Sequence, residues 1–447
     1  MIRSARAVVL VATLLTSYGW QWLLARVLGS WGQARWERVH RRNARRVART
    51  FVRLRGVYIK LGQVLSVLGT FLPKAYGDEL EGLQDSVPPR AFSEIEWRLR
   101  QALGPDAIGR FEWFDSTPIA AASLAQVHRA RTMSGQPVAV KVLYPGIERI
   151  VNSDLALLRR LLPIARWFIL VVRFERVLDQ LGAMLQRELD YQHEQQNMDR
   201  IRSILGHRGD VVIPRAIPEL CGPGVLTMTF EEGIKISDIE TLSQRGISAE
   251  ETARVLVACY LEMLLEHRIF HADPHPGNFL IQEGPKLVIL DFGAVEEVTP
   301  PLAEGMKRVV IGGLSRNPEL VLSGMEQMGF VAEGGDRALL QQVGHEYLKG
   351  LAAVKITNFA DIKREEATQL SGFLQLRGRM REVMRSVQYP EGYFYVERTL
   401  ALLFGLVGQL APNQGLPGIA APLASRALLK GLSGPLPPVN PPSDPRS

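Results

Sequence analysis

The sequence feature that most constrains the fold is the run of residues 271–293. In it, Asp273 is followed five positions later by Asn278, and then by an apolar, strand-like stretch that ends in Asp-Phe-Gly at Asp291. Moving a γ-phosphoryl group requires a carboxylate near the attacking oxygen, and oxygen ligands for the Mg²⁺ that neutralises the phosphates. Asp273 suits the first role, and Asn278 with Asp291 suits the second. The spacing therefore predicts a phosphoryl-transfer site of the kinase type.

Two histidines in the same run, His271 and His275, raise the alternative of a metal-binding pair. No cysteine or third histidine lies at ligand spacing from them. We therefore interpret both as packing or loop-fixing residues. Since a turn rich in Pro, Gly, Asn and Asp is usually only a turn, the catalytic interpretation depends on both halves of the motif occurring together.

An upstream segment supplies a lysine of matching chemistry. Residues 138–142 alternate in polarity and predict a β-strand with Lys141 as its one inward lysine. Kinases place such a lysine on their third strand, against the α- and β-phosphates. Residues 118–130 stand where a kinase carries a glycine-rich strand-turn-strand, but they are rich in alanine. We expect this loop to be tighter, with backbone NH groups less able to close over phosphates.

Together these segments resemble the UbiB/AarF family of atypical kinase-like proteins, over roughly residues 56–405. The matching motifs are KxGQ at Lys60-Leu61-Gly62-Gln63, the alanine-rich loop at Ala120 to Gln126, ExD at Glu188-Leu189-Asp190, and HxDxHxxN at His271 to Asn278. Ordinary protein kinases lack the first two, and small-molecule kinases of the aminoglycoside and choline type lack KxGQ. One departure is that residues 66–73 lack the arginine and aspartate that many relatives carry after KxGQ.

The resemblance implies an α+β, protein-kinase-like bilobal fold with an N-terminal helical KxGQ extension over the cleft. ATP and Mg²⁺ are the implied cofactors, with Asp273 and Lys141 as catalytic residues and with Asn278 and Asp291 as metal ligands. Lys141 is expected to pair with Glu194. The other implied nucleotide-binding residues are Ala120, Ala121, Ala122, Ser123, Leu124, Ala125 and Gln126.

The ExD carboxylates, Glu188 and Asp190, are implied to face the KxGQ helix. Lys60 and Gln63 on that helix would then cover the site where a protein substrate normally docks. On a helix, Asp190 lies one turn from Glu194 on the same face, while Glu188 points elsewhere.

The family resemblance further implies an atypical kinase or ATPase that supports isoprenoid-quinone (ubiquinone-type) biosynthesis or related lipid handling at a membrane. Its partners would be quinone-biosynthesis enzymes or a lipid-like small molecule. After Asp291 no Ala-Pro-Glu follows, and residues 298–301 start a helix where an activation segment would lie. This argues against a protein kinase acting in trans. A nucleotide-sensing scaffold for a membrane enzyme complex is the other alternative, and the complete set of catalytic residue types argues against it.

The net charge of +7 is concentrated at the N-terminus, where residues 1–56 contain twelve arginines and a single acid, Glu37. This local excess argues against a nucleic-acid footprint over the whole surface. Residues 7–25 are uncharged and long enough to span a bilayer, so a membrane anchor, an interfacial helix and a buried helix all remain open. Positive-inside logic would leave the kinase-like body on the cytoplasmic, or equivalent interior, side.

Residues 34–55 follow as a basic amphipathic helix. This predicts binding to anionic lipid headgroups, with a solvated helix packed on the body as the alternative. The two cysteines, Cys221 and Cys259, cannot build a disulfide framework, which indicates a reducing compartment.

The expected domain organisation has five parts. They are an apolar N-terminal helix (1–33), the basic helix with the KxGQ extension (34–108), the N-lobe (109–228), the C-lobe (229–433) and a Pro-rich tail (434–447).

Overall fold

The computed structural model describes residues 2–28, 35–67, 73–81, 89–165, 174–315, 317–342, 386–390, 392–414 and 418–424. The chain divides into two compact units, here called unit 1 and unit 2. Unit 1 comprises residues 1–196 and 215–230, and unit 2 comprises residues 197–214 and 231–447. The expected Pro-rich tail and residues 68–72, which follow the KxGQ segment, lie outside the described residues.

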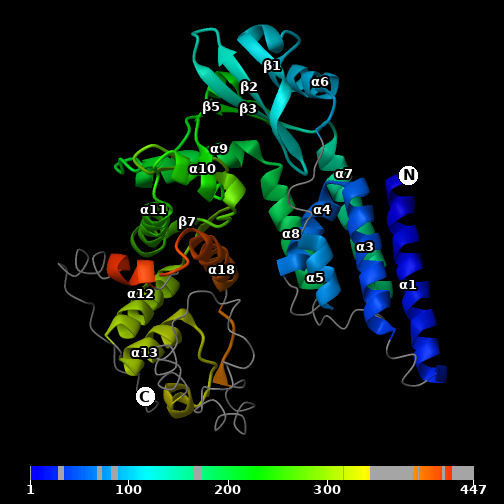
Figure 1. Cartoon of the computed structure of the whole chain (residues 1–447), viewed down its shortest axis with the longest axis vertical. Helices are drawn as coiled ribbons and strands as arrows, with labels where there is room; N and C mark the ends of the chain where they lie inside the picture. The colour runs from blue at the N-terminus through cyan, green and yellow to red at the C-terminus, as the bar shows by residue number, and fades with distance from the viewer. Residues whose placement is uncertain are drawn as a thin grey trace, which may run out of the picture. The chain divides into compact units, whose positions relative to one another are not determined.

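Unit 1 contains a four-stranded antiparallel sheet in the order β1-β2-β3-β5 (Figure 1). Its strands are β1 (Phe111–Ala121), β2 (Ala125–Thr132), β3 (Pro137–Leu143) and β5 (Val225–Thr229). In β3, Val138, Val140 and Val142 are fully buried on one face, and Lys141 lies on the other. Helix α6 (Phe92–Leu103) packs against β3 and β5. The predicted strand-turn-strand and the lysine-bearing strand are both confirmed.

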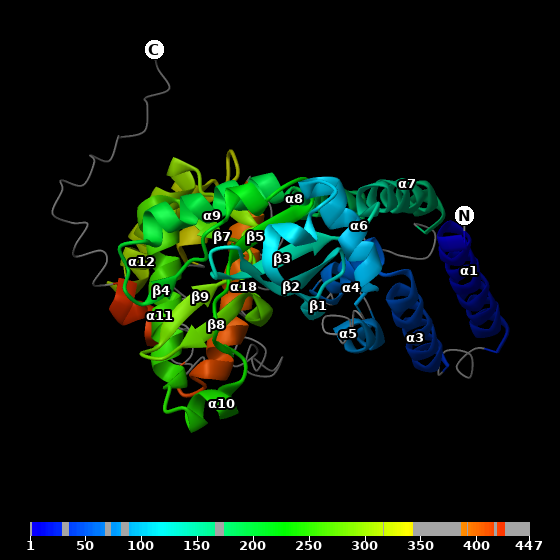
Figure 2. The same cartoon turned by 90° about the horizontal axis from the view of Figure 1, so that it is seen from above.

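The remaining helices of unit 1 precede or follow this sheet in the sequence. They are α1 (Ile2–Leu28), α3 (Trp36–Leu54), α4 (Val57–Val67), α5 (Lys74–Glu81), α7 (Ile147–Ala165) and α8 (Phe174–Glu188). Helix α3 packs beside α1, as both views show (Figures 1 and 2). It buries Val39, Val47, Phe51 and Leu54, which confirms the predicted amphipathic helix.

The short helix α5 starts at Lys74, and its described part ends at Glu81. Pro73 stands just before it, and the Pro73 carbonyl accepts a hydrogen bond from the Tyr76 NH. Proline is well suited to the start of a helix because its φ is already helical. Pro73 therefore directly precedes the first residue of α5, and it also follows the KxGQ segment.

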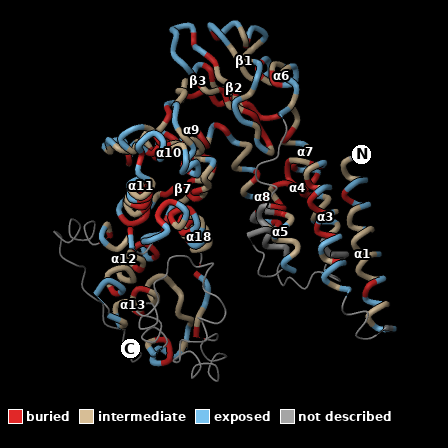
Figure 3. The backbone as a smooth tube through the Cα atoms, viewed as in Figure 1, coloured by how far each residue is buried: buried red, intermediate tan, exposed pale blue. Residues whose placement is uncertain are grey.

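Unit 2 carries two small sheets and a set of helices. The strands are β4 (Val211–Val212), β6 (Ile234–Lys235), β7 (Ile269–His271), β8 (Phe279–Gln282), β9 (Lys286–Ile289) and β10 (Val295–Glu297). The sheets run β4-β9-β8-β6 and β10-β7. The helices are α10 (Ile239–Gln244), α11 (Ala249–Leu261), α12 (Pro300–Leu314), α13 (Pro318–Met328) and α18 (Tyr393–Leu410). Buried residues gather along α11, β7 and α18 (Figure 3), around the fully buried Phe270, Phe279 and Phe292.

The helix that leads into residues 271–278 has a local change of winding. Ser248 caps α11 by accepting a hydrogen bond from the Glu251 NH. After Leu261 the helix continues as a π-helical turn. This turn ends at Arg268, whose φ of 58° is left-handed. Such π turns occur frequently at functional sites. The turn delivers the chain into β7, and hence into residues 271–278.

Candidate active site

His271 joins the two halves of the main motif in unit 2. It is fully buried, its Nε2 donates to the Asp291 carbonyl at 2.6 Å, and its Nδ1 accepts from the Tyr260 hydroxyl at 3.2 Å. Burial lowers the pKa of His271, although the nearby Asp291 and Asp273 carboxylates act in the opposite direction. A neutral ring with its proton on Nε2 satisfies both bonds. His271 is therefore a loop-fixing residue, as the sequence suggested.

Asp273 lies at the centre of a loop that closes on its own backbone. Its carbonyl accepts the His275 NH at 2.7 Å and the Asn278 side-chain amide at 3.0 Å. Its carboxylate accepts a hydrogen bond from the Arg398 guanidinium at 2.8 Å. The side chain is about a quarter exposed. The carboxylate is thus accessible and held in one orientation.

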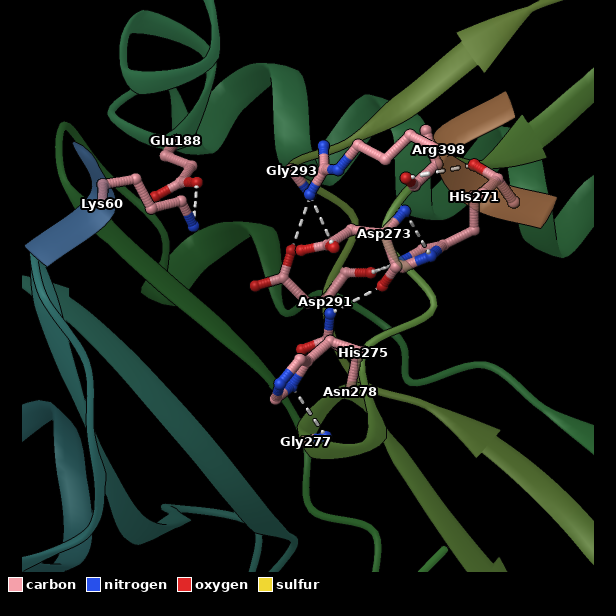
Figure 4. A network of polar contacts seen from close by, with 12 residues as sticks. Lys60, Glu188, His271, Asp273, His275, Gly277, Asn278, Asp291, Gly293 and Arg398 are labelled. Atoms are coloured by element: carbon pink, nitrogen blue, oxygen red, sulfur yellow. Dashed lines mark hydrogen bonds and ion pairs between the residues drawn. The ribbon is translucent and has the colours of Figure 1, made fainter. Parts of the chain in front are cut away.

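Asn278 and Asp291, the two candidate metal ligands, are brought together by the main chain. The Leu290 NH donates to the Asn278 carbonyl at 3.0 Å, and the Gly293 NH donates to the Asp291 carboxylate at 3.0 Å (Figure 4). The side-chain NH₂ group of Asn278 donates a hydrogen bond to the Asp273 carbonyl. The amide oxygen of Asn278 is therefore the atom that would bind a metal. One amide oxygen and one carboxylate are the hard oxygen donors that Mg²⁺ prefers. The residues present fit the implied ion.

Helix α18 contributes two contacts that sequence reasoning missed. Arg398 reaches Asp273, and the buried Thr399 hydroxyl donates to the Ala272 carbonyl at 3.2 Å. These residues are more than 120 positions from the loop and belong to no recognised motif. The available signal was a charged pair, Glu397 and Arg398, in an otherwise apolar helix.

A third missed residue is Asn197, on the helix α9 (Tyr191–Leu205) that the division between the units crosses. Its buried side-chain amide donates to the Phe292 carbonyl at 3.0 Å. Asn197 therefore ties the Asp-Phe-Gly segment to α9. Asn197 lies three residues after Glu194, so the two residues share one face of the helix. This spacing was the signal in the sequence that could have identified Asn197.

In unit 1, the expected pair of Lys141 and Glu194 is present. The Lys141 Nζ lies 2.6 Å from the Glu194 carboxylate, and 5.2 Å from the centre of the Tyr191 ring. The Glu194 side chain is only 1% exposed and that of Lys141 is 16% exposed. A charged pair this deeply buried is strongly sensitive to the loss of either partner. The role of Lys141 towards phosphates stays a prediction.

The KxGQ and ExD motifs also meet in unit 1. The Lys60 Nζ on α4 lies 2.5 Å from the carboxylate of Glu188, the last residue of α8 (Figure 4). The other ExD acid, Asp190, does not share a continuous helix with Glu188. Its carboxylate accepts the NH groups of Gln192 and His193 at 3.1 and 3.0 Å, which makes it the N-cap of α9. The side chain of Gln63 lies outside the described residues.

The alanine-rich loop is tied down by its own backbone. The Ala122 NH donates to the Ala125 carbonyl at 2.8 Å, and the Tyr144 NH donates to the Leu124 carbonyl at 2.9 Å. The first bond engages the Ala122 NH within the loop itself. This supports the expectation of a tight loop, while the role of its residues towards a nucleotide stays a prediction.

Gln126, the last candidate in the loop, has its side chain directed into the interior of unit 1. It is 1% exposed, and its Oε1 accepts the Arg90 NH at 2.9 Å. Its Nε2 lies 2.9 Å from the His128 Nε2. The described contacts of Gln126 are therefore structural, whereas Ala120 and Ala122 are exposed.

Comparison with known proteins assigns the chain to a family. A family model described as the ABC1 atypical kinase-like domain matches residues 82–323. Protein ACTIVITY OF BC1 COMPLEX KINASE 8, chloroplastic, of Arabidopsis thaliana is 31% identical over 406 residues, which are 84% of this chain and 53% of that protein. AarF domain-containing protein kinase 1 of Xenopus laevis is 33% identical over 266 residues, 58% of this chain and 51% of that protein. The chain thus spans about half the length of these two relatives.

A solved structure supports the fold. The structure described as the complex of Rv3197 with erythromycin from Mycobacterium tuberculosis has a TM-score of 0.57 and 24% identity, and the match covers 86% of this chain and 94% of that one. At this identity the likeness concerns the fold alone. The family model spans more than half of the chain and contains its motifs from the alanine-rich loop to Asp291. The chain therefore belongs to the ABC1, or UbiB/AarF, family of atypical kinase-like proteins.

Proposed function

We propose that the protein binds Mg-ATP and either hydrolyses it or transfers its phosphoryl group to a lipid-like small molecule. This activity would support isoprenoid-quinone (ubiquinone-type) biosynthesis or related lipid handling at a membrane. The observation that carries the proposal is the joining of Asn278 and Asp291 beside an oriented Asp273 carboxylate. An apolar N-terminal helix and an arginine-rich α3 support the membrane location.

In this proposal each residue has a role that its contacts suit. Asn278 and Asp291 would hold Mg²⁺, which supplies positive charge that offsets the phosphates. Lys141, oriented by Glu194, would hold the α- and β-phosphates. Asp273 would accept a hydrogen bond from the attacking water or hydroxyl, with Arg398 fixing the direction of its carboxylate. His271 would keep the loop and the Asp-Phe-Gly segment in register.

Specific observations argue against two alternative functions. A protein kinase acting in trans would need an activation segment after Asp291, yet α12 already starts at Pro300. A non-catalytic, nucleotide-sensing scaffold would not need Lys141, Asp273, Asn278 and Asp291 all to be present.

The fate of the γ-phosphate of labelled ATP tests the proposal. The full chain, Mg²⁺ and anionic liposomes would be incubated beside Asp291→Asn, with Asp179→Asn as a matched control at an exposed position. We expect label as free phosphate or on an extracted lipid, only when Asp291 is intact. In a parallel incubation with an added protein, label on that protein would favour the protein kinase. No transfer despite nucleotide binding would favour the scaffold.

A further inference from the structure

Helix α1 turns several polar side chains towards the protein and leaves several large apolar side chains exposed. Arg3 forms an ion pair with the buried Asp154 of α7 at 2.6 Å and also bonds the Leu54 carbonyl. The Tyr18 hydroxyl lies 3.1 Å from the His40 Nδ1 and 2.7 Å from the Tyr76 hydroxyl. A helix of a soluble protein normally has the opposite arrangement, with its apolar stripe facing the core.

Much of α1 is exposed (Figure 3), and one side of it, from Val9 to Val27, carries exposed residues that are mostly apolar. The exposed residues at helical spacing are Val9, Ala12, Thr16, Trp20, Leu23 and Val27. Trp20 and Val27 are 64% and 70% exposed. A contiguous exposed apolar surface of this kind marks a membrane or partner surface. Among the described residues α1 is the one helix long and apolar enough to cross a bilayer, by length and composition.

The contacts of α1 show that α3 accompanies it in the antiparallel direction. Arg3, near the start of α1, meets Leu54 at the end of α3. Ser17 accepts a hydrogen bond from Asn43 at 3.0 Å, in the first half of α3. Helix α3 carries six exposed arginines, Arg38, Arg41, Arg42, Arg45, Arg49 and Arg53. If the docked α1 crossed a bilayer, α3 would carry these charges to the depth of the hydrocarbon, where they are strongly disfavoured.

We infer that α1 and α3 form one membrane-docking surface in which α1 lies in the plane of the interface and does not span the bilayer. The apolar stripe of α1 enters the boundary between headgroups and acyl chains, and the arginines of α3 bind anionic phospholipid headgroups. Two tryptophans, Trp20 and Trp22, suit this boundary, because an indole ring is apolar with one polar NH. The inference rests on the proposed membrane location and specifies its geometry.

A cross-link between the helices separates the in-plane arrangement from a spanning one. In the full chain with Cys221→Ser, the pair Ser17→Cys and Asn43→Cys replaces side chains that are in contact. Oxidation would lock α1 onto α3, and Ser17→Cys alone is the control. Flotation with vesicles of phosphatidylglycerol and phosphatidylcholine should be the same within about twofold for locked and reduced protein. A loss of about tenfold or more on locking, or failure of the cross-link to form, would overturn the inference.

Substitutions on each helix test the two parts of the surface. Val9→Glu with Leu23→Glu should weaken flotation by about tenfold or more, whereas Trp97→Glu, at an exposed position on α6, should leave it unchanged. Arg49→Gln with Arg53→Gln should weaken it by about tenfold on anionic vesicles at low salt and hardly at all on neutral ones. Unchanged flotation together with lost self-association would instead make the stripe an interface with a second copy of the chain.

The same variants distinguish this inference from the proposed function. Asp291-dependent hydrolysis of ATP in detergent should persist in Val9→Glu with Leu23→Glu. Hydrolysis without in-plane docking would overturn the inference alone, and docking without any phosphoryl chemistry would overturn the proposed reaction alone.

Discussion

The candidate catalytic loop of unit 2 and the lysine pairs of unit 1 are held together by different kinds of contact. In unit 2 the motif residues of the site lie within one short run and main-chain groups join them, while Arg398 reaches Asp273 from the distant helix α18. His271 donates to the Asp291 carbonyl, and Asn278 donates to the Asp273 carbonyl. In unit 1 the partners are distant in the sequence and meet through side chains alone, as Lys141 and Glu194 do across 53 positions.

This difference separates geometry encoded locally from geometry that depends on packing. Backbone hydrogen bonds within a loop survive most changes of side-chain chemistry. A side-chain ion pair disappears with either partner, and it leaves an excess charge whose cost depends on burial. Substitutions in the unit 2 loop should therefore affect the reaction more than the fold, whereas substitutions in the ion pairs of unit 1 should also lower the stability of the fold.

The largest expected effect is on the reaction, from Asp291→Asn. Hydrolysis of ATP should fall about a thousandfold, on the order of 4 kcal/mol, because an amide is a poor substitute for a carboxylate at Mg²⁺. The melting temperature should hardly change, because the amide oxygen can still accept the Gly293 NH. A large loss of stability would break the comparison, since it would show that the loop depends on this side chain for its fold.

The next effect is on stability, and it compares two glutamates of unit 1. Glu194→Ala should lower the free energy of unfolding by about 3 kcal/mol, because it leaves the buried ammonium of Lys141 without this carboxylate. Glu188→Ala should cost only about 1 kcal/mol, since its side chain is 26% exposed and that of Lys60 is 18% exposed. Denaturant titrations would measure both. Equal losses would contradict the role assigned to burial.

Arg398→Ala should reduce hydrolysis about tenfold, or about 1.4 kcal/mol, by leaving the Asp273 carboxylate free to turn. Because the guanidinium orients Asp273 and is not assigned to the nucleotide, kcat should fall while KM stays nearly constant. Arg398→Lys should recover part of the activity, and Arg254→Ala, at a surface pair, should have no effect. A change confined to KM would place Arg398 on the substrate instead.

The pH dependence of stability should be similar in the two units, because each contains a buried histidine. Burial lowers the pKa of His271 in unit 2 and of His128 in unit 1. As the pH falls below about 6.5, the unfolded chain takes up protons that the folded histidines resist, so stability falls by up to about 1.4 kcal/mol per pH unit for each histidine. Unfolding titrations from about pH 8 to about pH 5.5 would show this. Rising stability over that range would contradict the assigned neutral rings.

The smallest expected effect is on nucleotide preference. Ala122→Gly should change the relative affinity for ATP and ADP by a few fold, about 1 kcal/mol or less, because it loosens the loop closed by the bond from the Ala122 NH to Ala125. Thermal shifts with each nucleotide would measure it, with Ala121→Gly in parallel. If neither substitution alters the preference, the tight-loop explanation is wrong.

The sequence predicted several elements correctly because their signals are short in range. The alternation around Lys141, the amphipathic period of α3 and the spacing from Asp273 to Asn278 each involve residues in one strand, helix or loop. The pairing of Lys141 with Glu194 was also anticipated, but through the family motifs and not through spacing. The continuous helix drawn through the ExD motif was wrong, because the Asp190 carboxylate competes for backbone NH groups and ends one helix as it caps the next.

By itself, therefore, the sequence determined the kinase-like family and the residue types of the candidate site, because periodicity and motif spacing are properties of neighbouring residues. The tertiary structure alone decided that Arg398 contacts Asp273, that Gln126 turns inward and that Arg3 of α1 pairs with Asp154. Each of these depends on which distant segments pack together. Such contacts arise from the burial of whole helix and sheet faces. A short stretch of sequence is not enough to predict them.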